Sequence, residues 1–103
     1  MRMTARQLER VRAATARHFG RDARLWLFGS RVDDSRRGGD YDLYLEVGPM
    51  DARALIDAKL AMLAELHATP EFEDERIDLV VRRRDSGPEQ PIHRSARTQG
   101  VPL

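Results

Sequence analysis

At 103 residues the chain has room for a single modest core, and we expect residues 1–103 to form one domain. Hydrophobic residues make up 41% and charged residues 34%, a composition that indicates a globular rather than a disordered chain. The formal net charge of +1 favours neither nucleic acid nor an acidic partner. The absence of cysteine excludes disulfides and thiolate metal sites within this sequence.

The opening segment carries no apolar core of a secretion signal, and no stretch approaches the ~18 apolar residues of a membrane span. We therefore expect a cytoplasmic protein without membrane contact.

Residues 4–19 predict a helix. Thr4 followed by Gln7 fits a capping box, and Gly20 is placed to end the helix. Apolar residues recur on one face, at Leu8, Val11, Ala14 or Thr15, and His18 or Phe19. The first 24 residues also carry seven arginines. We interpret this basic face as solvated helix surface; a phosphate-facing or partner-facing role is the alternative.

Two strands follow with a polar connection between them. Ala23–Phe28 is apolar enough to be buried on both faces, and Trp26 within it is expected in the core. Gly29 and Ser30 begin a turn or short helix that runs through Ser35. The second strand is expected over Tyr41–Val47 and closes at Gly48 and Pro49.

The second half predicts a helix, a strand and a short final helix. Asp51 is a good N-cap for a helix to about His67, with an apolar stripe suited to packing on a sheet. That stripe comprises Leu55, Ile56, Leu60, Met62, Leu63 and Leu66. An acidic, solvated loop over 71–75 holds Phe72 against the domain. Ile77–Arg82 forms the third strand, and the tail from Pro91 to Leu103 has room for one short helix.

This order of elements predicts an α/β (α+β) fold, in which helices pack on a small mixed β-sheet. No internal repeat, linker or second domain is evident in the sequence.

Asp40 and Asp42 stand at the start of the second strand. Because side chains alternate along a strand, these two carboxylates share one face, while the apolar residues from Tyr41 onward occupy the other. Two like charges this close repel each other unless a positive charge lies between them. The pair therefore predicts a cation site.

Asp78 interrupts the apolar third strand, where an unpaired buried carboxylate would be costly. If the second and third strands are neighbours, Asp78 lies beside Asp42. Three converging carboxylates suit Mg²⁺, and two ions ~3.5–4 Å apart can activate an attacking oxygen and stabilise leaving pyrophosphate. Gly29 would let the backbone approach a phosphate, and Ser30 would offer an N–H and a hydroxyl group.

Together these motifs resemble those of the minimal nucleotidyltransferases of the DNA polymerase β superfamily. Phe28–Arg31 is similar to the Gly-Ser motif of that family, Asp40–Leu43 to its paired aspartates, and Arg76–Val80 to its third aspartate strand. The resemblance covers nearly the whole chain, and each motif stands in the expected strand context. The chain departs from the family in the turn, at Val32, Asp34 and Gly39.

The resemblance implies a polymerase-β-like nucleotidyltransferase fold and Mg²⁺-dependent transfer of AMP from ATP to an acceptor hydroxyl. It implies that Asp40 and Asp42 hold two metal ions and that Asp78 ligates the catalytic one.

For the nucleotide, the resemblance implies that Gly29 and Ser30 seat the β- and γ-phosphates of ATP, with Arg31 as a further phosphate contact. Minimal members are commonly paired with a helical HEPN-domain toxin and transfer AMP to one of its tyrosines. The resemblance thus implies an antitoxin that forms a hetero-oligomer with a HEPN toxin.

Other functions share part of this pattern of residues. An antitoxin that neutralises its partner by binding alone is the alternative. An antibiotic-modifying nucleotidyltransferase is disfavoured because such enzymes usually carry an added helical domain. A haloacid-dehalogenase-like phosphatase is disfavoured because a polar turn, not a hydrophobic strand, precedes Asp40. Direct nucleic-acid binding is not expected, since the chain lacks the aromatic and basic surface of a single-strand binder.

Two further groups of residues are interpreted as structural. The histidines, at positions 18, 67 and 93, lack the spacing of metal ligands and are expected on helix surfaces or in packing. Arg82, Arg83 and Arg84 are interpreted as a solvated strand exit, with a phosphate or acidic-partner contact as the minority reading.

Overall fold

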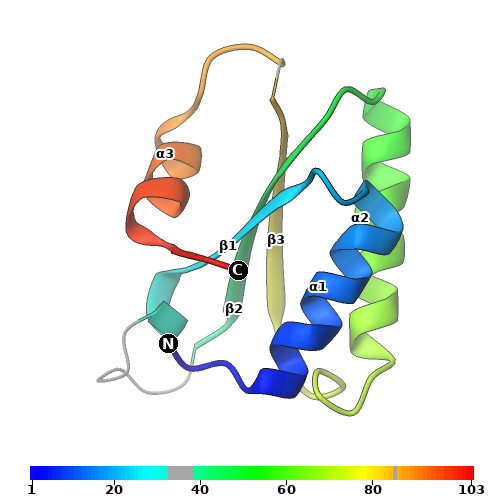
Figure 1. The fold of residues 1–103 in the computed structure, drawn as a ribbon, viewed down its shortest axis with the longest axis vertical. Helices are drawn as coiled ribbons and strands as arrows, with labels where there is room; N and C mark the ends of the chain where they lie inside the picture. The colour runs from blue at the N-terminus through cyan, green and yellow to red at the C-terminus, as the bar shows by residue number, and fades with distance from the viewer. Residues whose placement is uncertain (33–38, 85) are drawn as a thin grey trace.

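The computed structural model describes residues 1–32, 39–84 and 86–103, apart from the side chain of Ser30. These residues form a mixed α/β fold of three α-helices, one 3-10 turn and a four-stranded sheet (Figure 1). In chain order the elements are α1 (Ala5–Phe19), β1 (Arg24–Phe28), η1 (Gly29–Val32), β2 (Tyr41–Val47), α2 (Ala52–His67), β3 (Ile77–Arg83), α3 (Pro91–Gln99) and β4 (Val101–Pro102). The predicted mixed sheet with packed helices is confirmed.

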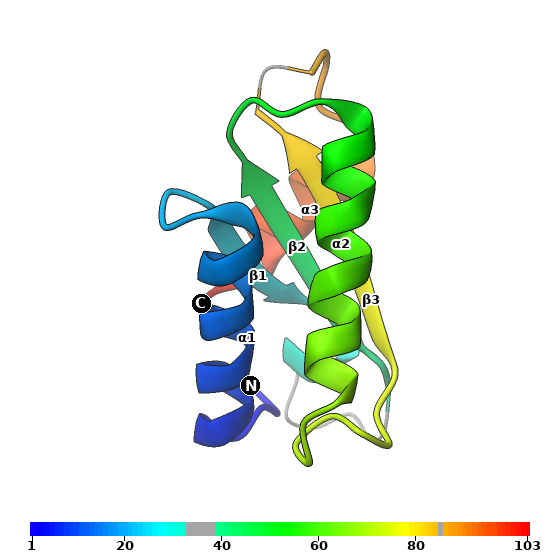
Figure 2. The same cartoon turned by 90° about the vertical axis from the view of Figure 1, so that its right-hand side faces the viewer.

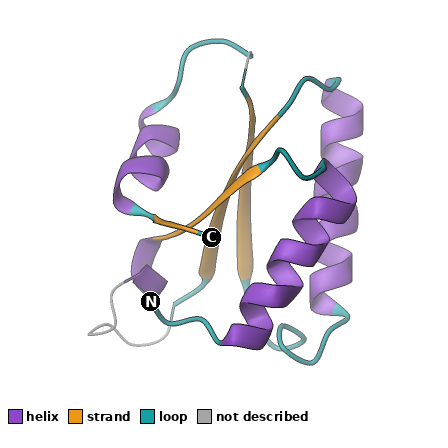
Figure 3. Ribbon diagram, viewed as in Figure 1, coloured by secondary structure: helices purple, strands orange, loops and turns teal. Residues whose placement is uncertain are grey.

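The sheet has the strand order β3-β2-β1-β4. β1 runs antiparallel to both β2 and β4, whereas β2 and β3 are parallel and joined by the crossover helix α2. Figures 2 and 3 show α1 and α2 side by side on one face of the sheet and α3 on the other. Within the described residues, no helix is long and apolar enough to cross a membrane.

The main core lies between the sheet and the pair α1 and α2. It is built from buried residues of β1, β2, β3 and the two helices, together with Phe72 from the loop after α2. The side chain of Phe72 has no exposed surface and meets the ring of Tyr41 edge-on, with centroids 5.3 Å apart. The prediction that Phe72 tucks onto the domain is confirmed.

The N-terminal capping box is also confirmed, and it extends into a buried polar connection. The Thr4 hydroxyl accepts from the Gln7 N–H at 3.1 Å, and the Gln7 side chain accepts from the Thr4 N–H at 3.0 Å. Gln7 is itself buried, and its side-chain amide is satisfied by two further hydrogen bonds. It accepts from the Tyr41 hydroxyl and donates to the carbonyl of Glu71, both at 3.1 Å. One side chain thus joins α1, β2 and the loop that follows α2.

The predicted sheet-facing stripe of α2 is wrong in part. Met62 and Leu66 are buried, but Ile56 and Leu60 are 54% and 60% exposed. Because α1 covers part of the same sheet face, α2 buries a narrower stripe than its apolar residues suggest.

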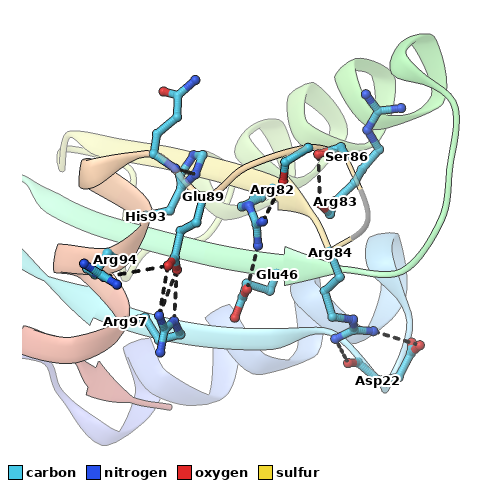
Figure 4. Close-up of polar contacts among 12 residues, drawn as sticks. Asp22, Glu46, Arg82, Arg83, Arg84, Ser86, Glu89, His93, Arg94 and Arg97 are labelled. Atoms are coloured by element: carbon cyan, nitrogen blue, oxygen red, sulfur yellow. Dashed lines mark hydrogen bonds and ion pairs between the residues drawn. The ribbon is translucent and has the colours of Figure 1, made fainter.

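The three arginines at the end of β3 are not a solvated strand exit as predicted. Arg82 lies 3.3 Å from a carboxylate oxygen of Glu46, and Arg84 lies 3.3 Å from a carboxylate oxygen of Asp22 (Figure 4). Arg83 donates to the carbonyl of Met50. Each guanidinium therefore joins β3 to another segment. The sequence showed the charges but not which carbonyls and carboxylates lie beside them.

The tail contains the predicted short helix, α3, and also a strand that was not predicted. β4 pairs with β1 over two residues, one of them Pro102, which is too little pattern to indicate a strand. α3 covers the second sheet face, where the ring of Tyr44 packs between Trp26 and His93. Burial, followed by the charge of Glu46, raises the pKa of Tyr44 to about 12. The expectations that Trp26 is core and that His93 packs are confirmed.

Replacing Phe72 should test the main core. The Phe72→Ala variant leaves a cavity where a fully buried ring meets Tyr41, so we expect a loss of about 3–5 kcal/mol in the free energy of unfolding. Ile56→Ala, at an exposed helix position, should change it by less than about 0.5 kcal/mol. Denaturant unfolding of both variants measures the difference, and equal losses would contradict this description of the core.

Candidate functional site

Asp42 and Asp78 face each other across the two central parallel strands. The register of β2 against β3 pairs Tyr41 with Ile77 and Asp42 with Asp78. Since Tyr41 and its alternate neighbours point into the main core, both carboxylates lie on the opposite face of the sheet. The prediction that Asp78 lies beside Asp42 is confirmed.

The glycine turn lies directly against this pair. Phe28 is the residue of β1 that pairs with Asp42, and Gly29 follows it at the start of η1. Gly29 has a φ of 74°, and a Cβ placed on it would lie only 2.2 Å from the Asp42 Oδ2 atom. Glycine is therefore required at this position for two reasons, its positive φ and the close approach of the Asp42 carboxylate.

The electrostatics of the pair are unfavourable to ionised Asp42. Its pKa is raised above the ordinary 3.8, first by partial burial, then by the negative charge of Asp78 and a side-chain hydrogen bond with it, and last by the charge of Asp40. A divalent cation would reverse these effects, because it would replace lost hydration and neutralise the repulsion. Carboxylate oxygens are also the ligands that Mg²⁺ prefers, so the residues present fit such an ion.

Asp40 differs from the other two aspartates in having an arginine as its neighbour among the described residues. It precedes β2, and its Oδ1 atom lies 3.9 Å from Nε of Arg76, the residue before β3. In the part of the chain that the structure describes, no group of three acidic or histidine side chains is gathered closely enough to hold a metal ion. The three-carboxylate ligand set stays a prediction.

The remaining predicted nucleotide contacts have other neighbours. The guanidinium of Arg31 lies 4.1 Å from the centre of the Tyr41 ring, donates to the carbonyl of Gly39 at 3.3 Å, and lies 3.7 Å from Glu75. These contacts hold the start of β2 against the turn. The backbone of Ser30 belongs to η1, but its side chain, like the rest of the predicted turn from Asp33 to Gly38, lies outside the described residues.

A cavity of about 480 Å³ adjoins the aspartate pair at the outer edge of β3. Its volume falls within the usual ~300–1,000 Å³ of small-molecule sites. Asp42 and Asp78 line it, together with Lys59 of α2 and Ile92 of α3. Sequence analysis missed both residues as part of the site. Lys59 is the only lysine in the chain, and this was the one signal that could have drawn attention to it.

Comparisons of the chain with models of protein families, with curated proteins and with solved structures found no match. What the residues themselves define is a mixed α/β chain with two facing aspartates beside a glycine turn.

Substituting Gly29 by alanine should lower the free energy of unfolding more than the same substitution at a glycine away from the site. Gly29→Ala and Gly87→Ala both place a side chain at positive φ, but an added Cβ meets Asp42 in the first case and nothing within 4 Å in the second. We expect Gly87→Ala to lose about 1 kcal/mol of unfolding free energy from strain, and Gly29→Ala about 1–3 kcal/mol more. Denaturant unfolding of the two variants measures the difference, which would vanish if Gly29 did not contact Asp42.

Removing the charge of Asp42 should stabilise the protein at neutral pH. A carboxyl whose pKa is raised on folding destabilises the fold when ionised, and this penalty disappears as pH falls through the raised pKa toward 3.8. We expect Asp42→Asn to raise the melting temperature at pH 7, and we expect this gain to shrink toward pH 4. Asp74→Asn, at an exposed loop position, is the control. An equal gain in melting temperature at pH 7 and pH 4 would show that the raised pKa of Asp42 is not its cause.

Proposed function

We propose that the chain is a nucleotidyltransferase with a polymerase-β-like fold, which transfers AMP from ATP to an acceptor hydroxyl. In this proposal the acceptor is a tyrosine of a HEPN-domain toxin and the chain is its antitoxin. The observation that carries the proposal is the contact of Gly29 with Asp42 while Asp42 faces Asp78. Motif segments separated by up to fifty residues thereby meet at one point.

The three aspartates would hold one or two Mg²⁺ ions, with Asp42 and Asp78 as the adjoining ligands and Asp40 completing the set. For Asp40 this requires release from Arg76, an ion pair at 3.9 Å that is partly exposed and therefore weak. A bound divalent cation supplies positive charge to the phosphates and to the acceptor oxygen.

Residues of the chain itself would let the triphosphate approach the backbone and would supply the general base. Gly29, with no side chain, lets the triphosphate come close to the backbone of the turn beside Asp42. Asp78 is exposed, so its carboxylate can accept the proton of the acceptor hydroxyl. The acceptor oxygen forms a bond to the α-phosphorus, the bond between this phosphorus and the bridging oxygen of the β-phosphate breaks, and pyrophosphate leaves.

Binding without turnover is the second candidate function. The observations that favour it are the ion pair of Asp40 with Arg76 and the contacts of Arg31 with Tyr41 and Gly39. In this case the chain would neutralise the toxin by covering it, and the aspartates would be remnants of an active ancestor.

Transfer of label from α-labelled ATP to the partner separates the two. The chain is incubated with labelled ATP, Mg²⁺ and the product of the neighbouring gene, and this candidate partner is tested for label, for toxicity and for a HEPN domain. We expect label on the partner, and a loss of at least ~100-fold with Asp42→Asn, because one carboxylate of the site is removed.

Asp74→Asn is the matched control, since it removes a carboxylate from an exposed loop position and should label the partner as the wild type does. If the partner is neutralised but carries no label with the wild-type chain, the enzymatic proposal is wrong and binding alone explains the antitoxin.

A further inference from the structure

The two edges of the sheet differ in how they are protected. One edge is β4, which has only two residues and includes Pro102, a residue that cannot donate to a further strand. The other edge is β3, a strand of seven residues without proline or lysine. An edge strand of this length presents a row of backbone N–H and C=O groups that can pair with another strand. The outer edge of β3 is therefore open to a partner.

The hydrogen bonds at both ends of β3 determine which backbone groups face outward. The carbonyl of Arg76 accepts from Tyr41, and the N–H of Arg84 donates to Val47. Because the direction of these groups alternates along a strand, the even-numbered residues of β3 bond to β2. The outward N–H and C=O groups are those of Ile77, Leu79, Val81 and Arg83.

We propose that two copies of the chain pair through β3, antiparallel, about a two-fold axis at Val80. This register uses the whole strand, since Ile77–Arg83 is symmetric about Val80. It places outward groups opposite each other, Leu79 against Val81 of the partner subunit, as an antiparallel ladder requires. At the ends the ladder is weaker, because the carbonyl of Arg83 already accepts from Ser86.

Charge complementarity identifies a second copy as the occupant. In this register Asp78 stands opposite the partner's Arg82, and the same pair recurs on the other side of the axis. Opposite charges at facing positions stabilise a strand pair, and like charges there destabilise it. Shifting the register by the two residues that the ladder allows would place Asp78 opposite Val80 or Arg84 of the partner subunit. Either shift would leave two residues at one end of β3 opposite residues that lie outside the strand.

Exposed apolar side chains flank β3 on both faces of the sheet. Ile56 and Leu60 of α2 are 54% and 60% exposed, and Ile92 of α3 is 48% exposed. Ile56 lines a hollow with Val81, and Ile92 lines one with Asp78 and Val80. A second copy related by the axis would cover these side chains, which adds apolar burial to the ladder.

The pairing would also add a positive charge to the aspartate site. Figure 4 shows Arg82 directed toward Glu46, at 3.3 Å. A guanidinium has five N–H donors, so Arg82 can keep this contact and still reach Asp78 of the partner subunit. Each subunit would then place a phosphate-binding group beside the other's Asp42 and Asp78.

Cross-linking tests the register. The chain has no cysteine, so Val80→Cys introduces a single thiol. At the axis the two Cα atoms would be ~4.5 Å apart, within the ~4.4–6.8 Å range of disulfides. We expect oxidation to convert most of this variant into a covalent dimer. Ile77→Cys, whose copies would lie ~20 Å apart, should remain monomeric on a non-reducing gel.

Charge reversal tests the pairing independently of cross-linking. Asp78→Arg and Arg82→Asp should each weaken the dimer by at least ~10-fold in sedimentation equilibrium, and the double variant should recover most of that loss. Residues four apart on one strand are ~13 Å apart, so the recovery cannot arise within a chain. A monomeric wild type with no Val80→Cys dimer, or equal cross-linking at Ile77→Cys, would overturn the proposal.

Discussion

The parallel pairing of β2 with β3 is the constraint on which the rest of the molecule depends. Parallel strands need a crossover, and α2 supplies it while closing one side of the main core. The register of this pair puts Asp42 opposite Asp78, and the antiparallel pairing of β1 brings Gly29 against Asp42. A shift of one residue between β2 and β3 would separate the carboxylates and turn apolar side chains out of the core.

The same pairing of strands places two negatively charged side chains next to each other, which is unfavourable. The carboxyl group of Asp42 is partly buried beside the charge of Asp78, and the pKa of Asp42 is raised as a result. Such an arrangement lowers the stability of the fold, and proteins keep it where charge is needed for binding or chemistry. The neighbouring packing compensates, since Phe72, Tyr41 and Gln7 tie the start of β2 to α1 and to the loop beyond α2.

Much of the fold follows from local patterns in the sequence. The Thr4 capping box, the alternation of β2 and the length of the α2 pattern were sufficient to predict these elements and to place Asp78 near Asp42. The burial of Gln7, the exposure of Ile56 and Leu60, and the pairing of Asp40 with Arg76 were not predictable. They depend on which segments meet in space, and no periodicity within a single element encodes that.

The proposed cation site at Asp42 and Asp78 is tested most directly by a carbon-13 NMR titration of the aspartate carboxyl groups, with and without Mg²⁺. We predict that the pKa of Asp42 lies above the ordinary 3.8, because of its partial burial and the neighbouring charge of Asp78. We also predict that Mg²⁺ lowers the pKa of Asp42, because the ion favours the ionised carboxylate. A pKa of Asp42 at its ordinary value that does not respond to Mg²⁺ would contradict both predictions.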